Sequence, residues 1–343
     1  MKIAANSRVA ILLENGIKGK HGKTGLAFLR YSEANIVAAI DPESVGESIM
    51  ALTGIDRDVP IVKNIKEALA YKPDALLIGI APSGGKLPPN LQAEVEIAIA
   101  TGISIINGLH TQLNPLFPNL KLNQWIWDIR QEPPGLTIGS AKARSLNCQR
   151  ILTVGTDMAI GKMSTSLEIY RAALSLGINA QFIGTGQAGI AIAGQGIPLD
   201  AVRVDFAAGA VEKTVLELGS GKELIIVEGQ GSLLHPGSTA TLPLIRGSQP
   251  TGLILVHRVG ATHIRDLPEI LIPPLPKVIQ LYETVASAGG TFGEVKVKAI
   301  ALNTFGMDET AAKGAIAETS AITGLPCSDV VRFGGKTLLS AIQ

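Results

Sequence analysis

The chain has 343 residues, and 30 lysines and arginines against 29 aspartates and glutamates give it a net charge of +1. This near-neutral balance argues against nucleic acid or an anionic membrane surface and favours a small-molecule partner. Because 46% of the residues are hydrophobic and 17% charged, the chain can fill a large core, which excludes general disorder. At roughly 100 to 200 residues per domain, the length predicts two domains.

The N-terminal half alternates apolar runs with helical stretches and glycine-rich turns, which is typical of parallel strands covered by helices. The predicted strands are Arg8–Leu13, Asn35–Ile40, Ala75–Ile80 and Ile103–Ile106. One predicted helix follows the glycine loop at residues 16–25 and runs to Tyr31. Two more cover residues 64–70 and 89–101. A second turn, Ala81–Gly85, and the stretch Asn107–His110 each follow a strand, so we expect both at the ligand-binding edge of one sheet.

The sequence Gln131-Glu-Pro-Pro-Gly135 interrupts this alternation, and the alternation then restarts. We therefore predict a Rossmann-like domain at residues 1–131, a linker at 132–149 and a P-loop NTPase-like domain at 150–343. The second domain has predicted strands at Arg150–Val154, Ala180–Ile183, Leu224–Val227, Leu253–Val256 and Val297–Leu302. Its predicted helices are Gly161–Leu176, Ala207–Leu218, Val278–Ser287 and Asp308–Thr323. The predicted fold class is α/β, with two doubly wound parallel sheets.

Cysteine content and the start of the chain bear on location. Cys148 and Cys327 are too few for a disulfide framework, which is typical of proteins from a reducing compartment. The residues from Met1 contain no apolar run long enough for a signal peptide or a membrane span. We expect a cytoplasmic protein, and the apolar content leaves room for a homodimer or a higher homo-oligomer.

A phosphate-binding loop is the most informative motif, because it lies between an apolar strand and an amphipathic helix. Backbone N–H groups of such a loop converge on phosphate oxygens, and a lysine adds a positive charge. We assign Lys162 this role and count it among the catalytic candidates. The phosphate- or cofactor-binding segment comprises Gly155, Thr156, Asp157, Met158, Ala159, Ile160, Gly161, Lys162, Met163, Ser164 and Thr165.

The loop departs from the common P-loop pattern in two ways. It has one more residue between its glycines, and Met163 stands where a serine or threonine normally binds Mg²⁺. Ser164 is the next hydroxyl, rotated by about 100° around the helix. Phosphate binding is therefore better supported than nucleotide hydrolysis.

A carboxylate follows another apolar strand, in Glu223-Leu-Ile-Ile-Val-Glu228-Gly-Gln-Gly-Ser232. Glu228 at this place can act as a general base or, with Ser164, bind Mg²⁺. Asp157 and Asp205 can complete an acidic set, although Asp205 is equally consistent with a helix cap.

The loop Gly155-Thr-Asp-Met-Ala-Ile-Gly-Lys162, together with Val227-Glu-Gly-Gln-Gly231, resembles the dethiobiotin synthetase group of P-loop enzymes. That resemblance covers about half the chain and departs from the group's pattern at Met163. It implies a ligase or kinase that uses ATP and Mg²⁺.

A closer resemblance spans nearly the whole chain. Asn107-Gly-Leu-His110, the Gly155 loop and Glu228-Gly-Gln-Gly-Ser-Leu-Leu-His-Pro236 resemble a bacterial family long described only as a P-loop domain of unknown function. Some members of that family are D-glutamate N-acetyltransferases that use acetyl-CoA. The segment Val59–Ala68, the strand that leads into Ala81-Pro-Ser83 and the stretch Ala98–Asn107 also look like the CoA-binding domain of succinyl-CoA ligases.

These resemblances imply an acetyl-CoA-dependent N-acetyltransferase that acts on an acidic amino acid. Glu228 or His235 would take a proton from the substrate ammonium, so that the free amine attacks the thioester. Arg203 and Arg246 are candidate partners of the substrate carboxylates, with Asp205 as a third substrate residue. Two alternatives stay open: an ATP- and Mg²⁺-dependent ligase or kinase, and a nucleotide-gated regulator without enzymatic activity.

Overall fold

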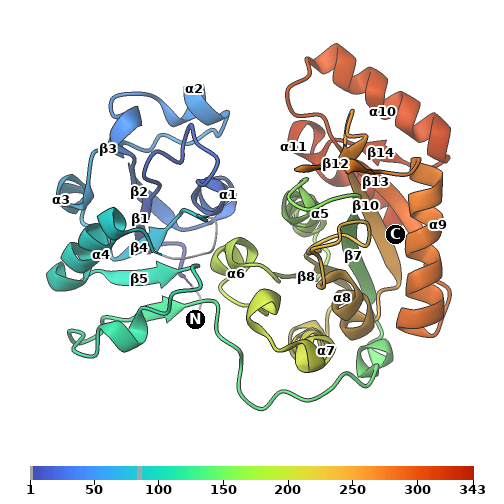
Figure 1. Ribbon diagram of the computed structural model, residues 1–343, viewed down its shortest axis with the longest axis horizontal. Coiled ribbons are helices and arrows are strands. Elements are labelled where there is room, and N and C mark those ends of the chain that lie inside the picture. The colour runs from blue at the N-terminus through green and yellow to red at the C-terminus, as the bar shows by residue number, and fades with distance from the viewer. Residues whose placement is uncertain (1–2, 83–86) are drawn as a thin grey trace. The chain divides into compact units, whose positions relative to one another are not determined.

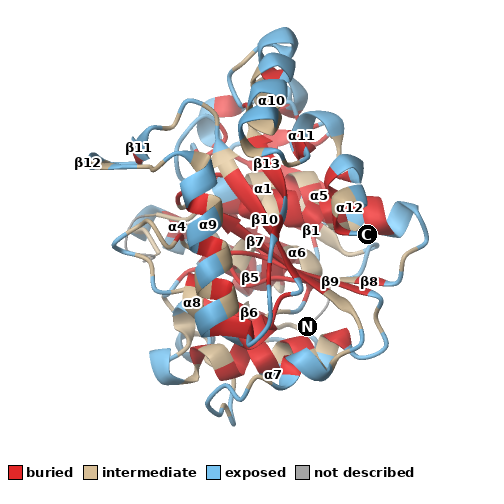
Figure 2. Ribbon diagram, turned by 90° about the vertical axis from the view of Figure 1, so that its right-hand side faces the viewer, coloured by how far each residue is buried: buried red, intermediate tan, exposed pale blue. Residues whose placement is uncertain are grey.

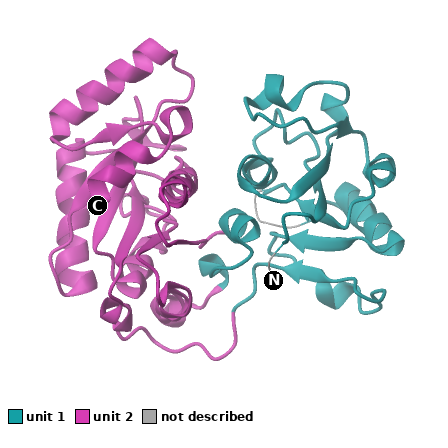
Figure 3. Cartoon of the chain, turned by 180° about the vertical axis from the view of Figure 1, so that it is seen from behind, with its two compact units in different colours: residues 1–132, 187–201 teal, residues 133–186, 202–343 magenta. Residues whose placement is uncertain are grey.

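The computed structural model describes residues 3–82 and 87–343. They form two compact units (Figures 1 and 3). The first contains residues 1–132 and 187–201, and the second contains residues 133–186 and 202–343. Residues 187–201, which the sequence placed inside the second domain, therefore group with the first unit, and residues 133–149 of the expected linker group with the second. The expected turn at Ser83–Gly85 lies outside the described residues.

The first unit is built on a six-stranded parallel sheet with the order β3-β2-β1-β4-β5-β6. Its strands are β1 (Arg8–Leu12), β2 (Asn35–Ile40), β3 (Ile61–Val62), β4 (Ala75–Ile78), β5 (Ser104–Asn107) and β6 (Ile126–Asp128). The order reverses between β1 and β4, which is the place where an open parallel sheet normally binds its ligand. The segments that follow β1 and β4 meet directly here. Gly25 N–H donates to the Gly79 carbonyl (2.7 Å), and Ala81 N–H donates to the His21 carbonyl (2.8 Å).

Helices cover both faces of this sheet, as the alternation of its strands requires. Val9 and Ile11 pack with one set of helices, whereas Ala10 and Leu12 pack with the other. The first set is α1 (Lys23–Tyr31), α2 (Ile49–Thr53) and α6 (Gln187–Ala193), and the second is α3 (Ile65–Ala68) and α4 (Pro89–Thr101). Helix α6 thus adds side chains from the middle of the chain to the first unit's core.

Polar contacts also hold α6 and the residues after it on the first unit. One guanidinium nitrogen of Arg130 donates to Gln187 Oε1 (2.8 Å) and lies 3.1 Å from a carboxylate oxygen of Asp200. Gln187 Nε2 in turn donates to Thr24 Oγ1 (3.4 Å) at the start of α1. The Arg130 side chain is only 12% exposed, so burial strengthens these contacts relative to a surface ion pair.

The second unit has a six-stranded parallel sheet with the order β14-β13-β10-β7-β9-β8. Its strands are β7 (Gln149–Gly155), β8 (Ala180–Ile183), β9 (Leu224–Val227), β10 (Gly252–Arg258), β13 (Val297–Asn303) and β14 (Cys327–Ser328). A separate antiparallel hairpin, β11 (His263–Ile264) and β12 (Leu267–Leu271), extends from the carboxyl end of β10 (Figure 2). Strand β7 lies between β9 and β10, so the strand order of this sheet also changes direction at β7.

The helices of the second unit bury the sheet between them, and the strands are its most buried elements (Figure 2). They are α5 (Lys162–Ser175), α7 (Ala207–Gly219), α8 (Thr241–Ser248), α9 (Leu275–Ala286), α10 (Glu309–Thr323), α11 (Val330–Phe333) and α12 (Lys336–Ile342). Helices α5, α11 and α12 share one core cluster with the strands. Helices α7 and α8 pack against each other and contact β7, β8 and β9.

The predicted fold class is confirmed, and most predicted strands coincide with observed ones to within two residues at each end. The helices and strands missed are short or locally polar: β3, β6, β14, α2, α6, α8, α11, α12 and the β11–β12 hairpin. Among residues 3–82 and 87–343, no helix has the length and apolar content needed to cross a membrane.

The chain segment before β7 is held on α7 by close backbone contact. The buried Glu212 carboxylate accepts hydrogen bonds from the backbone N–H groups of Ser140 and Lys142. A Cβ atom added at Gly209 would lie only 1.8 Å from the carbonyl oxygen of Thr137. Only glycine at this place on α7 lets the two backbones approach so closely.

This contact predicts opposite effects of the same substitution on two helices. Gly209→Ala should lower the free energy of unfolding by about 1 to 3 kcal/mol, because the new methyl group overpacks against a backbone carbonyl. Gly314→Ala is the control, since nothing lies within 4 Å of the added Cβ on α10. It should raise stability by up to about 1 kcal/mol through helix propensity. Urea unfolding measures both, and a Gly209→Ala protein as stable as wild type would contradict the packing described.

Candidate functional site

The Gly155–Gly161 loop joins the end of β7 to the start of α5, where the strand order of the sheet changes direction. An open α/β sheet binds its ligands at this kind of place. The loop turns sharply, with Ala159 at φ 52° and Gly161 at φ 117°. A side chain at Gly161 would be strained, so the second glycine of the motif is required by the backbone. The predicted strand–loop–helix context of the P-loop is therefore present.

Lys162 begins α5 and is buried, with 5% of its surface exposed. Its Nζ donates to the Asp157 carbonyl oxygen (2.6 Å), inside the same loop. Burial lowers the pKa of Lys162 from 10.5 to about 8, while the carboxylates of Asp157 and Glu228 act in the opposite direction. The loop thus holds a buried cation next to two acidic groups.

Asp157 links the P-loop to the β11–β12 hairpin. Its Oδ1 accepts from its neighbour's N–H at Met158 (2.6 Å), and its Oδ2 accepts from Arg265 N–H (2.7 Å) between the two hairpin strands. The residue is 4% exposed. With backbone donors on both oxygens, Asp157 shapes the loop and supplies negative charge near Lys162.

Glu228 follows β9 and is also buried, at 5% exposure. Its Oε2 accepts from the backbone N–H groups of Thr185 (2.8 Å) and Gly186 (3.2 Å), both at the end of β8. The Thr185 hydroxyl donates to the Glu228 carbonyl (2.9 Å). Two converging N–H donors hold this carboxylate in one orientation, on the same sheet edge as Lys162.

The turn after Glu228 packs tightly under the P-loop. A Cβ atom at Gly229 would lie 1.7 Å from the Thr153 carbonyl and 3.1 Å from Lys162 Cδ. The Ser232 hydroxyl donates to the Gly155 carbonyl (2.7 Å), and the Tyr282 hydroxyl of α9 donates to the same oxygen (2.7 Å). The two predicted motifs are therefore joined directly at the Gly155 carbonyl. Tyr282, which the sequence did not indicate, adds a second hydrogen bond to the same oxygen.

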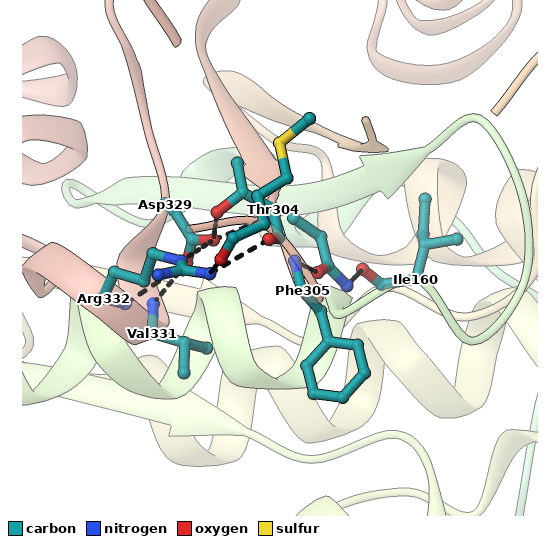
Figure 4. Close-up of polar contacts among 8 residues, drawn as sticks. Ile160, Thr304, Phe305, Asp329, Val331 and Arg332 are labelled. Atoms are coloured by element: carbon teal, nitrogen blue, oxygen red, sulfur yellow. Dashed lines mark hydrogen bonds and ion pairs between the residues drawn. The ribbon is translucent and has the colours of Figure 1, made fainter. Parts of the chain in front are cut away.

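On its other side the loop is held by the end of β13 (Figure 4). Asn303 Nδ2 donates to the Ile160 carbonyl oxygen (2.9 Å). The next residue, Thr304, is fixed by Asp329, whose Oδ2 accepts from the Thr304 N–H (2.9 Å) and hydroxyl (2.5 Å). Arg332 adds bonds to the Thr304 and Met307 carbonyls. The sequence assigned Asn303 no role, because its partner is 143 residues away.

A histidine also contacts the loop. Thr156 Oγ1 lies 2.9 Å from His257 Nδ1, at the end of β10. Burial lowers the pKa of His257 to about 4, so the ring is neutral at neutral pH and its partner is a hydroxyl. The sequence assigned His257 no role, since its spacing fits no metal or catalytic motif.

Two observations concern the predicted metal site. The Thr165 hydroxyl donates to the Gly161 carbonyl (3.0 Å) and is buried. In the part of the chain that the structure describes, no three His, Cys, Asp or Glu side chains lie together in a way that could hold a metal. The assignment of Mg²⁺ to Ser164 and Glu228 stays a prediction.

The predicted substrate residues separate into two groups. Asp205 and Arg246 both line a cavity of about 1010 Å³ in the second unit. Arg203 is not among the described residues that line this cavity, and its guanidinium lies 4.8 Å from the ring centroid of Phe206. His235 lies in the turn after Glu228, where its Nδ1 accepts from Gly237 N–H (3.0 Å).

Comparison with known proteins gives the family. A family model described as a domain of unknown function with a P-loop domain (DUF1611) matches residues 137–339, and its Rossmann-like N-terminal counterpart matches residues 42–132. This chain belongs to the DUF1611 family. The predicted family membership is thereby confirmed, and the matched P-loop domain contains both Lys162 and Glu228.

Individual relatives match most of the chain. A D-glutamate N-acetyltransferase from Pseudoalteromonas sp. is 33% identical over 282 residues, which is 81% of this chain and 83% of that protein. A D-glutamate N-acetyltransferase from Tritonibacter scottomollicae is 33% identical over 284 residues, which is 81% of this chain and 84% of that protein. The crystal structure of a DUF1611 protein from Anabaena variabilis is 59% identical, with a TM-score of 0.94, and covers 98% of this chain and 99% of that one.

The buried lysine of this DUF1611 chain predicts a pH-dependent stability difference. Because folding lowers the Lys162 pKa from 10.5 to about 8, the unfolded chain binds the proton more tightly between these values. The cost of burying the charge is full below about pH 8 and disappears as the pH rises to 10.5. The unfolding free energy of wild type relative to Lys162→Met should therefore increase by roughly 3 kcal/mol across this window. Denaturant unfolding at several pH values measures the difference, and a constant difference would contradict the lowered pKa.

Proposed function

We propose that this chain is an acetyl-CoA-dependent N-acetyltransferase whose acceptor is an acidic amino acid, with D-glutamate as the first candidate. The observation that carries the proposal is the 33% identity, over 81% of the chain, to two proteins named D-glutamate N-acetyltransferase. The P-loop site is consistent with a donor substrate that carries several phosphate groups. The expected cytoplasmic location and homo-oligomeric assembly stay predictions.

The residues of the loop fit the phosphate groups of acetyl-CoA. Lys162 Nζ donates to the Asp157 carbonyl of the same loop. A phosphate oxygen carries a full negative charge, so it can replace this carbonyl as the acceptor. The backbone N–H groups at the start of α5 add the positive end of the helix. Acetyl-CoA supplies an acyl group activated as a thioester.

Glu228 is the proposed general base. It would accept a proton from the ammonium group of the amino acid, and the free amine would then attack the thioester carbonyl. The new C–N bond forms as the C–S bond breaks, the nitrogen gives up a second proton to leave a neutral amide, and the CoA thiolate takes up a proton and leaves as the thiol. The N–H groups of Thr185 and Gly186 keep the carboxylate oriented while it does this.

His235 fits a different role from the one first assigned. Because its Nδ1 accepts from Gly237 N–H, the neutral ring carries its proton on Nε2. An Nε2–H group donates a hydrogen bond, for example to the developing oxyanion of the thioester, and does not accept a proton. Glu228 is therefore the stronger candidate for the base.

An ATP- and Mg²⁺-dependent ligase or kinase is the second candidate, and the P-loop with its lysine favours it. Met163 stands at the place of the usual Mg²⁺-binding serine or threonine, and the nearby Thr165 hydroxyl donates to the Gly161 carbonyl. A nucleotide-gated regulator would bind ATP without turnover. Three readouts separate these candidates: release of the CoA thiol, formation of phosphate or ADP, and binding of ATP.

The test measures release of the CoA thiol from acetyl-CoA with D-glutamate, L-glutamate or no acceptor, each with and without ATP and Mg²⁺. The proposal predicts acceptor-dependent thiol release that needs neither ATP nor Mg²⁺. Phosphate or ADP formation without thiol release would support the ligase or kinase. ATP binding with neither reaction would support the regulator.

Replacement of the proposed base should affect turnover more than binding. In Glu228→Gln, kcat should fall by about 100-fold or more, as expected when a general base is removed. The KM for acetyl-CoA should change little. Glu223→Gln is the matched control, because Glu223 lies just before the same strand and accepts from Asn179 N–H. Equal kcat values for Glu228→Gln and wild type would reject the assignment.

Removal of the P-loop charge should affect binding directly. Lys162→Met should weaken acetyl-CoA binding by about tenfold or more, because a charge-assisted hydrogen bond to a phosphate is lost. Lys213→Met, on an exposed position of α7, is the control for loss of a positive charge. Calorimetry measures the affinities, and circular dichroism checks the fold. An unchanged dissociation constant in a folded Lys162→Met protein would remove the P-loop from cofactor binding.

A further inference from the structure

We infer that the 1010 Å³ cavity of the second unit is the acceptor site, and that it selects an amino acid with two carboxylates and one ammonium group. This inference rests on the proposed function. It adds the place where the acceptor binds and the side chains that recognise it, including Arg144 and Gln249, which the sequence did not single out.

The charges at the cavity are the complement of such an acceptor. Arg144, from the segment before β7, and Arg246, from α8, supply two guanidinium groups, and Asp205 supplies one carboxylate. An amino acid such as glutamate carries two carboxylates and one ammonium. Charged groups are recognised most strongly by opposite charges that also donate or accept hydrogen bonds.

Both guanidinium groups are positioned by other contacts. The Arg144 guanidinium lies 5.7 Å from the ring centroid of Phe292, which also lines the cavity. Arg246 Nε donates to the Gly289 carbonyl (3.3 Å). A guanidinium has five N–H donors in a planar fork, so each arginine keeps donors for a carboxylate while it makes these contacts.

Gln249 adds a buried acceptor that the protein leaves unused. This residue lines the cavity and is 2% exposed. Its Nε2 donates to the carbonyls of Arg246 (2.7 Å) and Gly290 (2.6 Å), which fixes which end of the amide is the oxygen. Within the described residues, Oε1 has no hydrogen-bond partner. A buried oxygen in this state is costly, and an ammonium group of the acceptor would satisfy it.

The cavity borders the turn that follows the proposed base. Leu233, Ser238 and Thr241 line the cavity. Each makes a hydrogen bond to this turn or to Tyr282, which contacts the P-loop. Leu233 N–H donates to the Tyr282 hydroxyl, which donates to the Gly155 carbonyl. The hydroxyls of Ser238 and Thr241 bond the backbones of Ser232 and Gln230, respectively. The cavity therefore borders the turn that begins at Glu228 and supports the P-loop, while Glu228 and Lys162 themselves are not among its described lining residues.

The volume and the walls suit a reaction of two substrates. Ligand cavities commonly measure about 300 to 1,000 Å³, and a single amino acid fills only a small part of this space. The remainder, next to the apolar side chains of Leu233, Leu242 and Pro243, leaves room for the acyl end of the donor. Acyl transfer requires that the amine and the thioester share one space.

Neutral replacements of the two arginines test the inference. In Arg144→Gln and Arg246→Gln, the KM for D-glutamate should rise by about tenfold or more, while the KM for acetyl-CoA stays within about twofold. The preference for glutamate over glutamine should fall as well, since one carboxylate loses its partner. Arg171→Gln is the matched control, because Arg171 is 44% exposed on α5 and does not line the cavity.

The outcomes separate this inference from the proposed function. If wild type acetylates no dicarboxylic amino acid, the proposed function fails. If wild type is active and both arginine variants keep the wild-type KM for glutamate, the acceptor site lies elsewhere. A rise in the KM for acetyl-CoA alone would assign the cavity to the donor and overturn the inference. Asp205→Asn, an exposed change of charge only, provides a second test if an arginine variant does not fold, and it should also raise the KM for glutamate.

Discussion

A buried cation at the end of the central strand is the constraint on which the second unit's site depends. The Lys162 ammonium is removed from water, which is costly unless polar and acidic groups surround it. The Asp157 carbonyl, the Asp157 carboxylate and Glu228 supply these groups. The lysine is thus held where water screens its charge least, beside a loop whose backbone can receive phosphate oxygens. Its pKa of about 8 keeps it mostly protonated at neutral pH.

The structure around this cation depends on positions where a side chain would not fit. The turn after β9 approaches Thr153 so closely at Gly229 that a methyl group there would collide with the backbone. The same turn supports the P-loop through Ser232 and borders the cavity that contains the charged side chains. The carboxyl edge of the sheet therefore brings together a phosphate-binding loop and a fixed carboxylate, and the turn that packs under the loop also borders the charged cavity.

Local patterns were sufficient to predict the alternating elements and the P-loop, because periodicity and glycine spacing are properties of neighbouring residues. They could not predict contacts between distant segments. Helix α6 follows a strand of the second unit but adds Ile190 to the first unit's core. Asn303 and Tyr282 reach the loop across more than a hundred residues of sequence. Of the predicted substrate residues, Asp205 and Arg246 share a cavity, whereas Arg203 packs on Phe206, a difference that only the tertiary fold decides.

Calorimetric titration of the wild-type protein with acetyl-CoA, and separately with ATP and Mg²⁺, tests the central claim most directly. If the buried lysine and its loop serve an acyl donor, acetyl-CoA should bind tightly without metal, and ATP with Mg²⁺ should bind weakly. Tight binding of ATP with Mg²⁺, together with no detectable binding of acetyl-CoA, would contradict the account and assign the P-loop to nucleotide chemistry.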